Sequence, residues 1–167
     1  LIIAEAGVNH NGDLSLAKKL VDLAAVAGAD VVKFQTFKAE DLVTMKAEMA
    51  CYQKETTKSN GSQYEMLKRL ELGFDDFKTL KKYCDSKNIR FLSTGFDIKS
   101  LDFLREINNG LWKIPSGEIT NLPYLEFLGK LNEEIIISSG MATLQEVVTA
   151  AEILTENGTK RENITVL

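Results

Sequence analysis

The feature that most constrains the fold of this chain is a regular alternation between two kinds of segment. Short apolar runs rich in β-branched residues alternate with longer segments in which apolar residues recur at helical spacing. This alternation is typical of repeated βα units, in which helices cover a parallel sheet. We therefore expect an α/β fold whose exact type depends on the number of strands.

Six apolar runs are candidate strands. They cover residues 1–4, 30–35, 90–94, 111–114, 134–138 and 164–167. Helices are predicted from Leu14 to the glycine at position 28 and over residues 75–86, 98–107, 123–130 and 144–156. Six such strands fit either an incomplete (β/α)₈ barrel or a complete doubly wound sheet, and periodicity does not separate the two. Because both ends fall inside apolar runs, we expect residues 1–167 to be part of a longer chain.

Composition narrows the class of protein. The 167 residues are 44% hydrophobic and 26% charged, as expected for about one soluble globular domain. No apolar run approaches the roughly 20 residues that span a bilayer, and no signal peptide is recognisable, so a cytoplasmic protein is expected. The net charge of −4 argues against a nucleic-acid partner. Cys51 and Cys84 lack the spacing of a zinc site or disulfide framework and are interpreted as free thiols.

The stretch from residue 37 to about residue 70 is too long and polar for a simple βα loop. Residues 63–70 could form a short helix within it. In a barrel this insertion would follow the second strand, at the end of the barrel where active sites are built. Tyr52, Gln53, Gln63 and Tyr64 could contact a substrate there, although packing is the simpler interpretation.

Polar residues at the ends of the first two strands are candidates for chemistry. Glu5 follows an apolar run and could orient water or transfer a proton, or it could be a buried carboxylate satisfied by backbone or lysine partners. Lys33 and Gln35 share one strand face by the two-residue period. Lys33 could hold a carboxylate or phosphate, or pair with an acidic neighbour such as Glu5. His10, the only histidine, is more typical of a structural turn than of a metal site.

The end of the fourth strand carries the densest group of polar residues. Lys113, Ser116 and Glu118 lie within six residues, next to Gly117, and form a plausible cradle for phosphate or carboxylate. Ser138 opens a second hydroxyl-rich turn, which precedes a helix whose N-terminus also favours anions. Ordinary capping explains many such Ser-Gly turns.

Four motifs together resemble the sialic acid synthase family, which includes bacterial N-acetylneuraminate and legionaminate synthases. The motifs cover residues 3–12, 32–37, 112–118 and 138–141, in the family's order, and residues 119–125 add to the resemblance. The resemblance implies a (β/α)₈ barrel, of which this chain holds roughly the first six strands. It also implies condensation of phosphoenolpyruvate with an N-acylated amino sugar such as N-acetylmannosamine, with release of phosphate. The choice of acyl sugar stays open.

The resemblance also implies roles for individual residues. Lys33, Lys113, Ser116 and Ser138 would hold the phosphate and carboxylate of phosphoenolpyruvate, Gln35 would lie alongside the substrates, and Glu5 and Glu118 match the family's active-site glutamates. No Schiff base is needed in this chemistry, so both lysines can stay protonated.

The family uses a divalent metal, Mn²⁺ or Mg²⁺, and its metal-binding histidines would come from strands after Leu167. The resemblance therefore implies no metal ligand within this chain, and a homodimer whose C-terminal antifreeze-like domain is not present here. Gly95 stands where the family usually has proline, which predicts a looser loop after the third strand. Asp97, in the same loop, could cap the next helix.

Two other functions remain open from the residues alone. In a Schiff-base aldolase, Lys113 or Lys33 would attack a keto substrate after burial lowers its pKa. A truncated, non-catalytic module that binds sugar phosphates would use the same anion-binding turns without the later strands.

Overall fold

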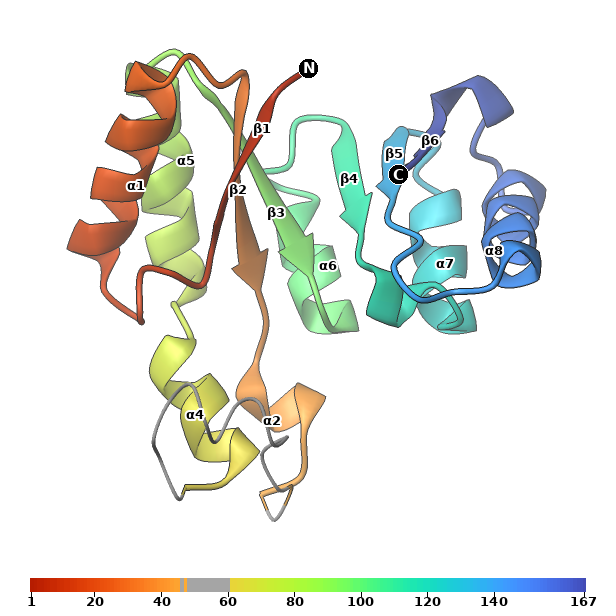
Figure 1. The fold of residues 1–167 in the computed structure, drawn as a ribbon, viewed down its shortest axis with the longest axis horizontal. Coiled ribbons are helices and arrows are strands. Elements are labelled where there is room, and N and C mark those ends of the chain that lie inside the picture. Colours follow the sequence, from red (N-terminus) through yellow and green to blue (C-terminus); the bar gives the residue numbers. More distant parts are fainter. Residues whose placement is uncertain (46, 48–60) are drawn as a thin grey trace. The chain divides into compact units, whose positions relative to one another are not determined.

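The computed structural model describes residues 1–45, 47 and 61–167, and these residues form two compact units. The first unit is Leu1–Phe91 and the second is Leu92–Leu167. Strands and helices alternate in both (Figure 1). Cys51, Tyr52 and Gln53 lie outside the described residues.

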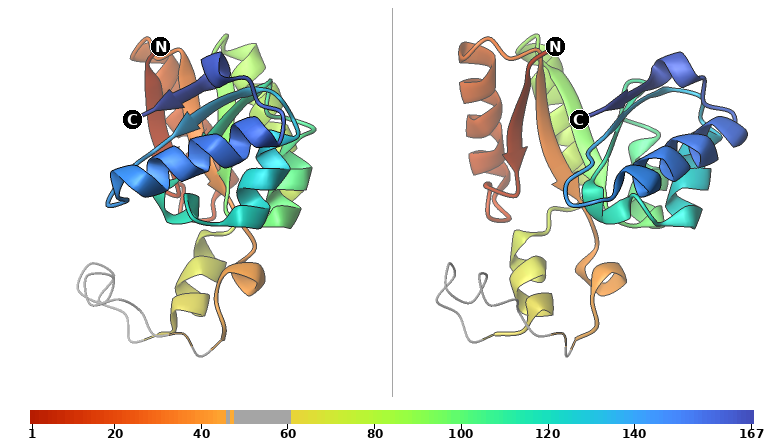
Figure 2. Two further views of the ribbon diagram at one scale, coloured as in Figure 1. Left: turned by 90° about the vertical axis from the view of Figure 1, so that its right-hand side faces the viewer. Right: turned by 45° about the vertical axis from the view of Figure 1, so that its right-hand side comes forward.

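The first unit is built on a sheet with the strand order β1-β2-β3. β1 (Ile3–Gly7) pairs in parallel with β2 (Val31–Thr36), and β3 (Arg90–Gly95) begins in this unit. α1 (Leu14–Val26) and α5 (Phe74–Ser86) pack against each other on one side of the sheet (Figures 1 and 2).

The two helices are also joined by polar contacts at their ends. Tyr83 donates its hydroxyl hydrogen to the Asp22 carboxylate at 3.0 Å, and Lys87 forms an ion pair with Asp22 at 2.7 Å. These hydrogen bonds, that from Lys87 first, hold the pKa of Asp22 below its usual value.

Two short helices lie between β2 and α5, at the end of the sheet toward which β1 and β2 run (Figure 1). They are α2 (Ala39–Leu42) and α4 (Gln63–Leu70). The Glu71 carboxylate follows α4 and accepts hydrogen bonds from Lys38 Nζ at 2.9 Å and from the Ala39 amide at 3.1 Å. Lys68 Nζ lies 3.1 Å from Glu71 Oε2. Burial raises the pKa of Glu71, but these donors outweigh it and leave the pKa below its usual value.

The second unit is built on the sheet β4-β5-β6. β4 (Leu111–Ile114) pairs in parallel with β5 (Glu134–Ile137), which pairs in parallel with β6 (Ile164–Val166). α6 (Ile98–Leu104) precedes β4. α7 (Leu122–Gly129) and α8 (Leu144–Glu156) connect the strands of this sheet, with the 3₁₀ turns η1 (Ser116–Glu118) and η2 (Arg161–Asn163). α7 and α8 pack together, where Thr159 donates its hydroxyl hydrogen to the Gly129 carbonyl at 3.1 Å.

Side chains at the helix starts explain why the helices begin where they do. Asp13 accepts hydrogen bonds from the Ser15 and Leu16 amides at the start of α1, and Asp97 accepts one from the Ser100 amide at the start of α6. Each such cap is typically worth about 1 kcal/mol. α4 and α8 begin with complete capping boxes.

Each unit has its own apolar core. In the first, Phe34 of β2 stacks on Phe91 with ring centroids 6.0 Å apart, and Val31 and Val32 are fully buried. In the second, Ile137 of β5 and Leu154 of α8 are fully buried. A fully buried side chain of this size contributes roughly 1.5–3 kcal/mol of hydrophobic stabilisation.

All six predicted strands and the predicted helices are confirmed, and the short helix over residues 63–70 is α4. The first strand is Ile3–Gly7 and not residues 1–4, so Glu5 lies within β1 and not after it. The helix α2 was not expected. Among the described residues, no helix is both long and apolar enough to cross a membrane.

Candidate functional site

Three of the predicted site residues meet at the end of β1 and β2 in the first unit. Glu5 lies opposite Lys33 in the register of the two strands, and Lys33 Nζ lies 2.5 Å from Glu5 Oε2. The register slips between Glu5 and Gly7, which makes a β-bulge. A Cβ atom placed on Gly7 would lie 3.1 Å from Glu5 Oε1 and 3.6 Å from Gln35 Nε2. Glu5, Lys33 and Gln35 therefore surround one bulge, a device that re-aims side chains near active sites.

The Glu5–Lys33 ion pair answers a question that the sequence left open. Lys33 does pair with an acidic neighbour, and the neighbour is Glu5. The Glu5 side chain is nevertheless 49% exposed, whereas that of Lys33 is 13% exposed. A pair with so much solvent contact contributes only about 0–1 kcal/mol to stability. The exposed carboxylate remains accessible to a substrate.

Lys113 occupies a different environment in the second unit. It is only 9% exposed, and its Nζ donates a hydrogen bond to the Ile114 carbonyl at 2.6 Å. The adjacent Trp112 points to the opposite face of β4, where its Nε1 donates to Glu133 at 2.5 Å. This backbone acceptor helps to offset the cost of burying the ammonium group. Its positive charge at the end of β4 makes Lys113 a candidate for binding an anion.

The two hydroxyl-rich turns of the second unit lie against each other. Ser116 starts η1 two residues after the end of β4, and Gly140 lies after β5 with a φ of +54°. A Cβ on Gly140 would lie 2.6 Å from Ser116 Oγ, so only glycine allows this approach. The Ser138 amide donates to the Ile114 carbonyl at 3.0 Å, which ties the second turn to the end of β4. The structure thus brings Ser116 and the Ser138 turn together at the end of the β4–β5 pair.

Glu118 ends η1 and is partly exposed. Its carboxylate accepts a hydrogen bond from Asn121 Nδ2 at 2.6 Å. Asn121 in turn caps α7 by accepting from the Tyr124 amide at 3.3 Å. Glu118 is thereby fixed in orientation next to the Ser116 turn.

Thr94 of β3 was not among the predicted site residues. Its side chain is 2% exposed, and its Oγ1 has no hydrogen-bond partner among the described residues. A buried unpaired hydroxyl costs free energy that a bound ligand or water can recover. Thr94 therefore joins the candidate ligand-binding residues of the second unit. The available signal was the Ser93-Thr94-Gly95 sequence at the end of β3.

The loop after β3 is anchored and not loose, in contrast to the expectation from Gly95. Tyr124 donates its hydroxyl hydrogen to the Gly95 carbonyl at 2.7 Å, and burial raises the pKa of Tyr124. A Cβ on Gly95 would lie 2.9 Å from Leu101 Cδ2, so the glycine permits close packing of α6. Asp97 in this loop is the N-cap of α6, as one interpretation of the sequence held.

Other residues considered from the sequence lie elsewhere in the first unit. His10 is fully buried in the turn after β1. Cys84 of α5 is a buried free thiol whose pKa burial raises to about 12. Gln63 and Tyr64 open α4 and are partly exposed. Within residues 1–45, 47 and 61–167, no group of three or more His, Cys, Asp or Glu side chains is arranged to hold a metal ion.

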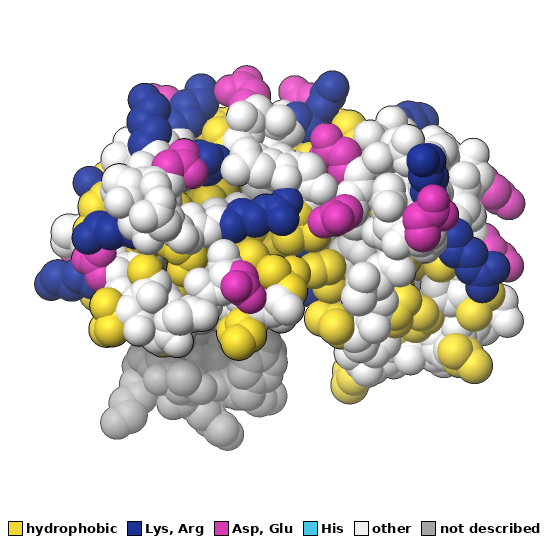
Figure 3. Space-filling model, turned by 90° about the horizontal axis from the view of Figure 1, so that it is seen from above, with side chains coloured by type: hydrophobic (Ala, Val, Ile, Leu, Met, Phe, Trp, Pro, Cys, Tyr) yellow, Lys and Arg dark blue, Asp and Glu magenta, His cyan; other side chains and the backbone are white. Residues whose placement is uncertain are grey.

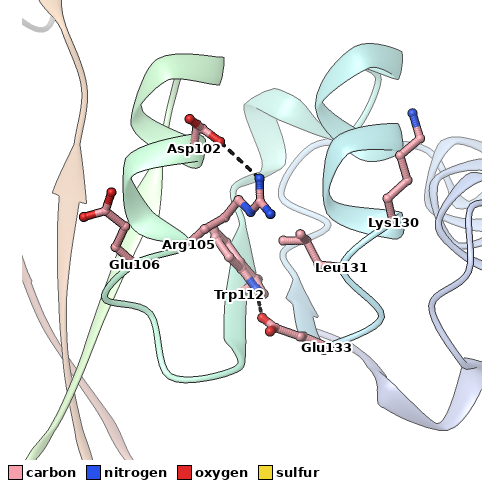
Figure 4. Close-up of a pocket in the computed structure, with 7 residues that line it drawn as sticks. All are labelled: Asp102, Arg105, Glu106, Trp112, Lys130, Leu131 and Glu133. Carbon is pink, nitrogen blue, oxygen red and sulfur yellow. Dashed lines mark hydrogen bonds and ion pairs between the residues drawn. The ribbon is translucent and has the colours of Figure 1, made fainter.

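A cavity of about 610 Å³ lies in the second unit beside Trp112 (Figure 4). Its charged lining is largely paired internally, because Arg105 binds Asp102 at 3.2 Å and Glu133 accepts from Trp112. The cavity lies on the face of β4 opposite to Lys113, since adjacent strand residues point to opposite faces. It is therefore separate from the candidate site.

Charge on the molecular surface is mixed. Figure 3 shows acidic and basic side chains intermingled on the face drawn there. The chain as a whole carries 20 Lys and Arg against 24 Asp and Glu. An anionic ligand would therefore depend on local groups such as Lys113 and the neighbouring turns.

The fold has a counterpart among solved structures. The structure of N-acetylneuraminic acid (sialic acid) synthetase from Leptospira borgpetersenii matches with a TM-score of 0.80 and 33% sequence identity, over 99% of this chain and 52% of that chain. The class is therefore the α/β barrel of the sialic acid synthases, present here as a partial barrel of about six strands.

Sequence relatives make the assignment narrower. A model of the NeuB family matches residues 20–167. N,N'-diacetyllegionaminic acid synthase from Campylobacter jejuni is 55% identical over all 167 residues, which is 50% of that protein. The enzyme of the same name from Legionella pneumophila is 54% identical over 151 residues, covering 90% of this chain and 42% of that protein. The chain belongs to the NeuB family and spans about half the length of these relatives.

Proposed function

We propose that the complete protein condenses phosphoenolpyruvate with an N-acylated amino sugar to give a sialic-type nonulosonic acid and inorganic phosphate. The observation that carries this proposal is the buried Lys113 beside the paired turns of Ser116 and Ser138 in a member of the NeuB family. The names of the relatives favour a diacetylated, legionaminic-type product.

In this proposal, the second unit holds phosphoenolpyruvate. Lys113 supplies a positive charge, and the hydroxyls of Ser116 and Ser138 and nearby backbone amides supply further donors. Charge-assisted hydrogen bonds of this kind bind carboxylate and phosphate without a generally basic surface. Gly140 keeps the two turns close enough to share one anion.

The first unit supplies the acid–base group. The nucleophilic C3 of phosphoenolpyruvate attacks the aldehyde carbon of the open-chain sugar, forming the new C–C bond. Water adds to C2 and loses a proton, the aldehyde oxygen gains a proton, and the C2–O bond to phosphate breaks. Glu5 is exposed enough to take or deliver one of these protons, while Lys33 keeps the carboxylate oriented and Gln35 lies beside it.

The proposal also includes a divalent metal and a homodimer. The described residues do not form a cluster suited to Mn²⁺ or Mg²⁺, so no step is assigned to a metal here. We propose that the metal ligands follow residue 167 and that the complete protein is a homodimer.

The direct test uses phosphoenolpyruvate labelled with ¹⁸O in the oxygen that bridges C2 and phosphorus. We expect the label in the released phosphate, because the C–O bond breaks and the P–O bond stays intact. Label retained in the sugar product would refute the mechanism. Borohydride treatment in the presence of pyruvate serves as the control for an aldolase, since a Schiff base on Lys33 or Lys113 would be trapped covalently.

A further inference from the structure

The turn between β1 and α1 is closed by its own backbone. The Asn11 amide donates to the Val8 carbonyl at 3.0 Å, and the Asp13 amide donates to the His10 carbonyl at 2.9 Å. Asn11 and Gly12 both have positive φ values, of 50° and 75°. This turn begins immediately after the bulge at Gly7, so its conformation sets where β1 ends.

The His10 side chain is buried beneath this turn and accepts a hydrogen bond from it. The side chain is fully buried, its ring centroid lies 6.1 Å from that of Phe34, and its Nδ1 accepts a hydrogen bond from the Gly12 amide at 3.1 Å. Because Nδ1 accepts, the neutral ring carries its proton on Nε2. Burial lowers the pKa of His10, which favours this neutral form.

Gly12 joins the turn to the insertion that follows β2. A Cβ on Gly12 would lie 2.4 Å from the carbonyl oxygen of Arg69, at the end of α4. Immediately after α4, the Glu71 carboxylate binds Lys38 and the Ala39 amide, just beyond β2. The end of α4 thus contacts the chain beyond both β1 and β2, the strands that carry Glu5 and Lys33.

The turn and α4 also share a cavity. It has a volume of about 490 Å³ and is lined by Val8, Asn9 and Asn11 from the turn and by α4 residues that include Met66 and Arg69. The shape of this cavity depends on the seating of the turn against α4.

We propose that His10 is a positioning residue of the active site: by accepting the Gly12 amide hydrogen, its neutral imidazole keeps the β1–α1 turn seated on α4. In this position the turn fixes the bulge at Gly7, which orients Glu5. The turn also forms one wall of the adjacent cavity. The kinetic part of this inference rests on the proposed synthase function, whereas the geometric part does not.

Two conservative substitutions in the complete protein separate the two ring nitrogens. Asparagine places an acceptor near the position of Nδ1, whereas glutamine places its amide near the position of Nε2. We expect H10N to keep turnover within about twofold of the wild type and H10Q to lose about tenfold, the effect of leaving one buried amide unpaired. Turnover is measured per folded molecule, well below the melting temperature. Equal turnover of the two variants would overturn the proposal, and so would lower melting temperatures with unchanged turnover.

A spectroscopic measurement tests the geometry without catalysis. In ¹⁵N-labelled protein, the His10 imidazole, assigned by its disappearance in H10N, should show the neutral tautomer protonated at Nε2 near pH 7. A charged ring, or a proton on Nδ1, would contradict the geometry. If the wild-type protein forms no nonulosonic acid, the proposed function fails while this measurement still decides the role of His10 in the turn.

A matched glycine pair tests the contact with α4. Gly12 and Gly28 have nearly the same φ, 75° and 76°, but a Cβ on Gly28 meets nothing within 4 Å. We expect G12A to lower turnover about tenfold and G28A to leave it unchanged. Because the two variants carry the same backbone strain, the difference in turnover reports the contact with α4. The H10Q/G12A double variant should lose no more than the worse single variant, because both break the same contact. A fully additive loss would show that His10 acts elsewhere.

Discussion

Each unit contains one lysine of the candidate site, and the two lysines lie in different surroundings. In the first unit, Lys33 is neutralised by Glu5, and the pair sits beside a bulge with the carboxylate half exposed. In the second, Lys113 is buried among backbone groups next to two turns rich in hydroxyls and amides. A pair that is already neutral suits an uncharged sugar, and the exposed half of the Glu5 carboxylate can be reached from solvent. A buried cation surrounded by donors suits a small anion. We therefore propose that phosphoenolpyruvate binds at Lys113 and that Glu5 acts on the sugar.

The largest effect should come from removing the charge of Glu5. We expect E5Q in the complete protein to lower turnover about 10²–10⁴-fold, the range that general acid–base groups supply, with near-normal phosphoenolpyruvate binding. Because the ion pair is half exposed, the melting temperature should fall by no more than about 2–4 °C. Turnover and thermal melting are measured on the same preparation. Near-wild-type turnover per folded molecule would remove Glu5 from the mechanism.

The second effect tests the anion site of the other unit. K113A should weaken phosphoenolpyruvate binding by about 10–150-fold, equivalent to roughly 1.5–3 kcal/mol for a lost charge-assisted bond. Calorimetric titration with phosphoenolpyruvate measures it. The exposed Lys130 of the same unit provides the control, K130A, which should bind normally. Equal affinities in the two variants would mean that the anion binds somewhere else.

A smaller effect is expected from the glycine that brings the two turns together. G140A introduces a Cβ 2.5 Å from Ser116 Cβ at a φ of +54°, whereas a Cβ on Gly117 meets nothing within 4 Å. We expect the KM for phosphoenolpyruvate to rise about tenfold in G140A and to stay unchanged in G117A. Steady-state kinetics with saturating sugar make the comparison. Similar KM values for both variants would separate Ser116 from the anion site.

The last effect is on stability and not on activity, and it concerns the first unit at low pH. The pKa of Glu71 is lower in the folded than in the unfolded protein, so its stabilising contribution is present above about pH 4.5 and is lost as the pH falls through the folded pKa. E71Q should cost about 1.5–3 kcal/mol at pH 7 and flatten the loss of stability in acid. Urea unfolding between pH 3 and 7 measures both. The exposed Glu40 gives the control, E40Q, and the same acid profile in the two variants would contradict this role for Glu71.

Most of the fold could be predicted from local patterns. The apolar periods located six strands, and the capping residue Asp97 marked a helix start, because both signals depend on neighbours in sequence. The end of β1 could not be predicted well. The bulge between Glu5 and Gly7 depends on pairing with β2, which the sequence of β1 does not reveal.

The candidate site could be predicted residue by residue but not as contacts. The two-residue period correctly placed Lys33 and Gln35 on one face, whereas the partner of Lys33 stayed open until strand register was known. Thr94 was not identified because its significance lies in a missing hydrogen bond, which only a three-dimensional structure can show. The contact between Gly140 and Ser116 likewise joins residues of two different βα units.

The buried thiol of Cys84 has a consequence for chemical labelling. With a pKa of about 12, only about 10⁻⁵–10⁻⁴ of the thiol is ionised at pH 7–8, and the sulfur has no contact with solvent. In a C51S background, alkylation of Cys84 must therefore wait until α5 separates from its neighbours. The rate of labelling therefore reports how often the first unit opens. Mass spectrometry can measure this rate in the absence of any substrate.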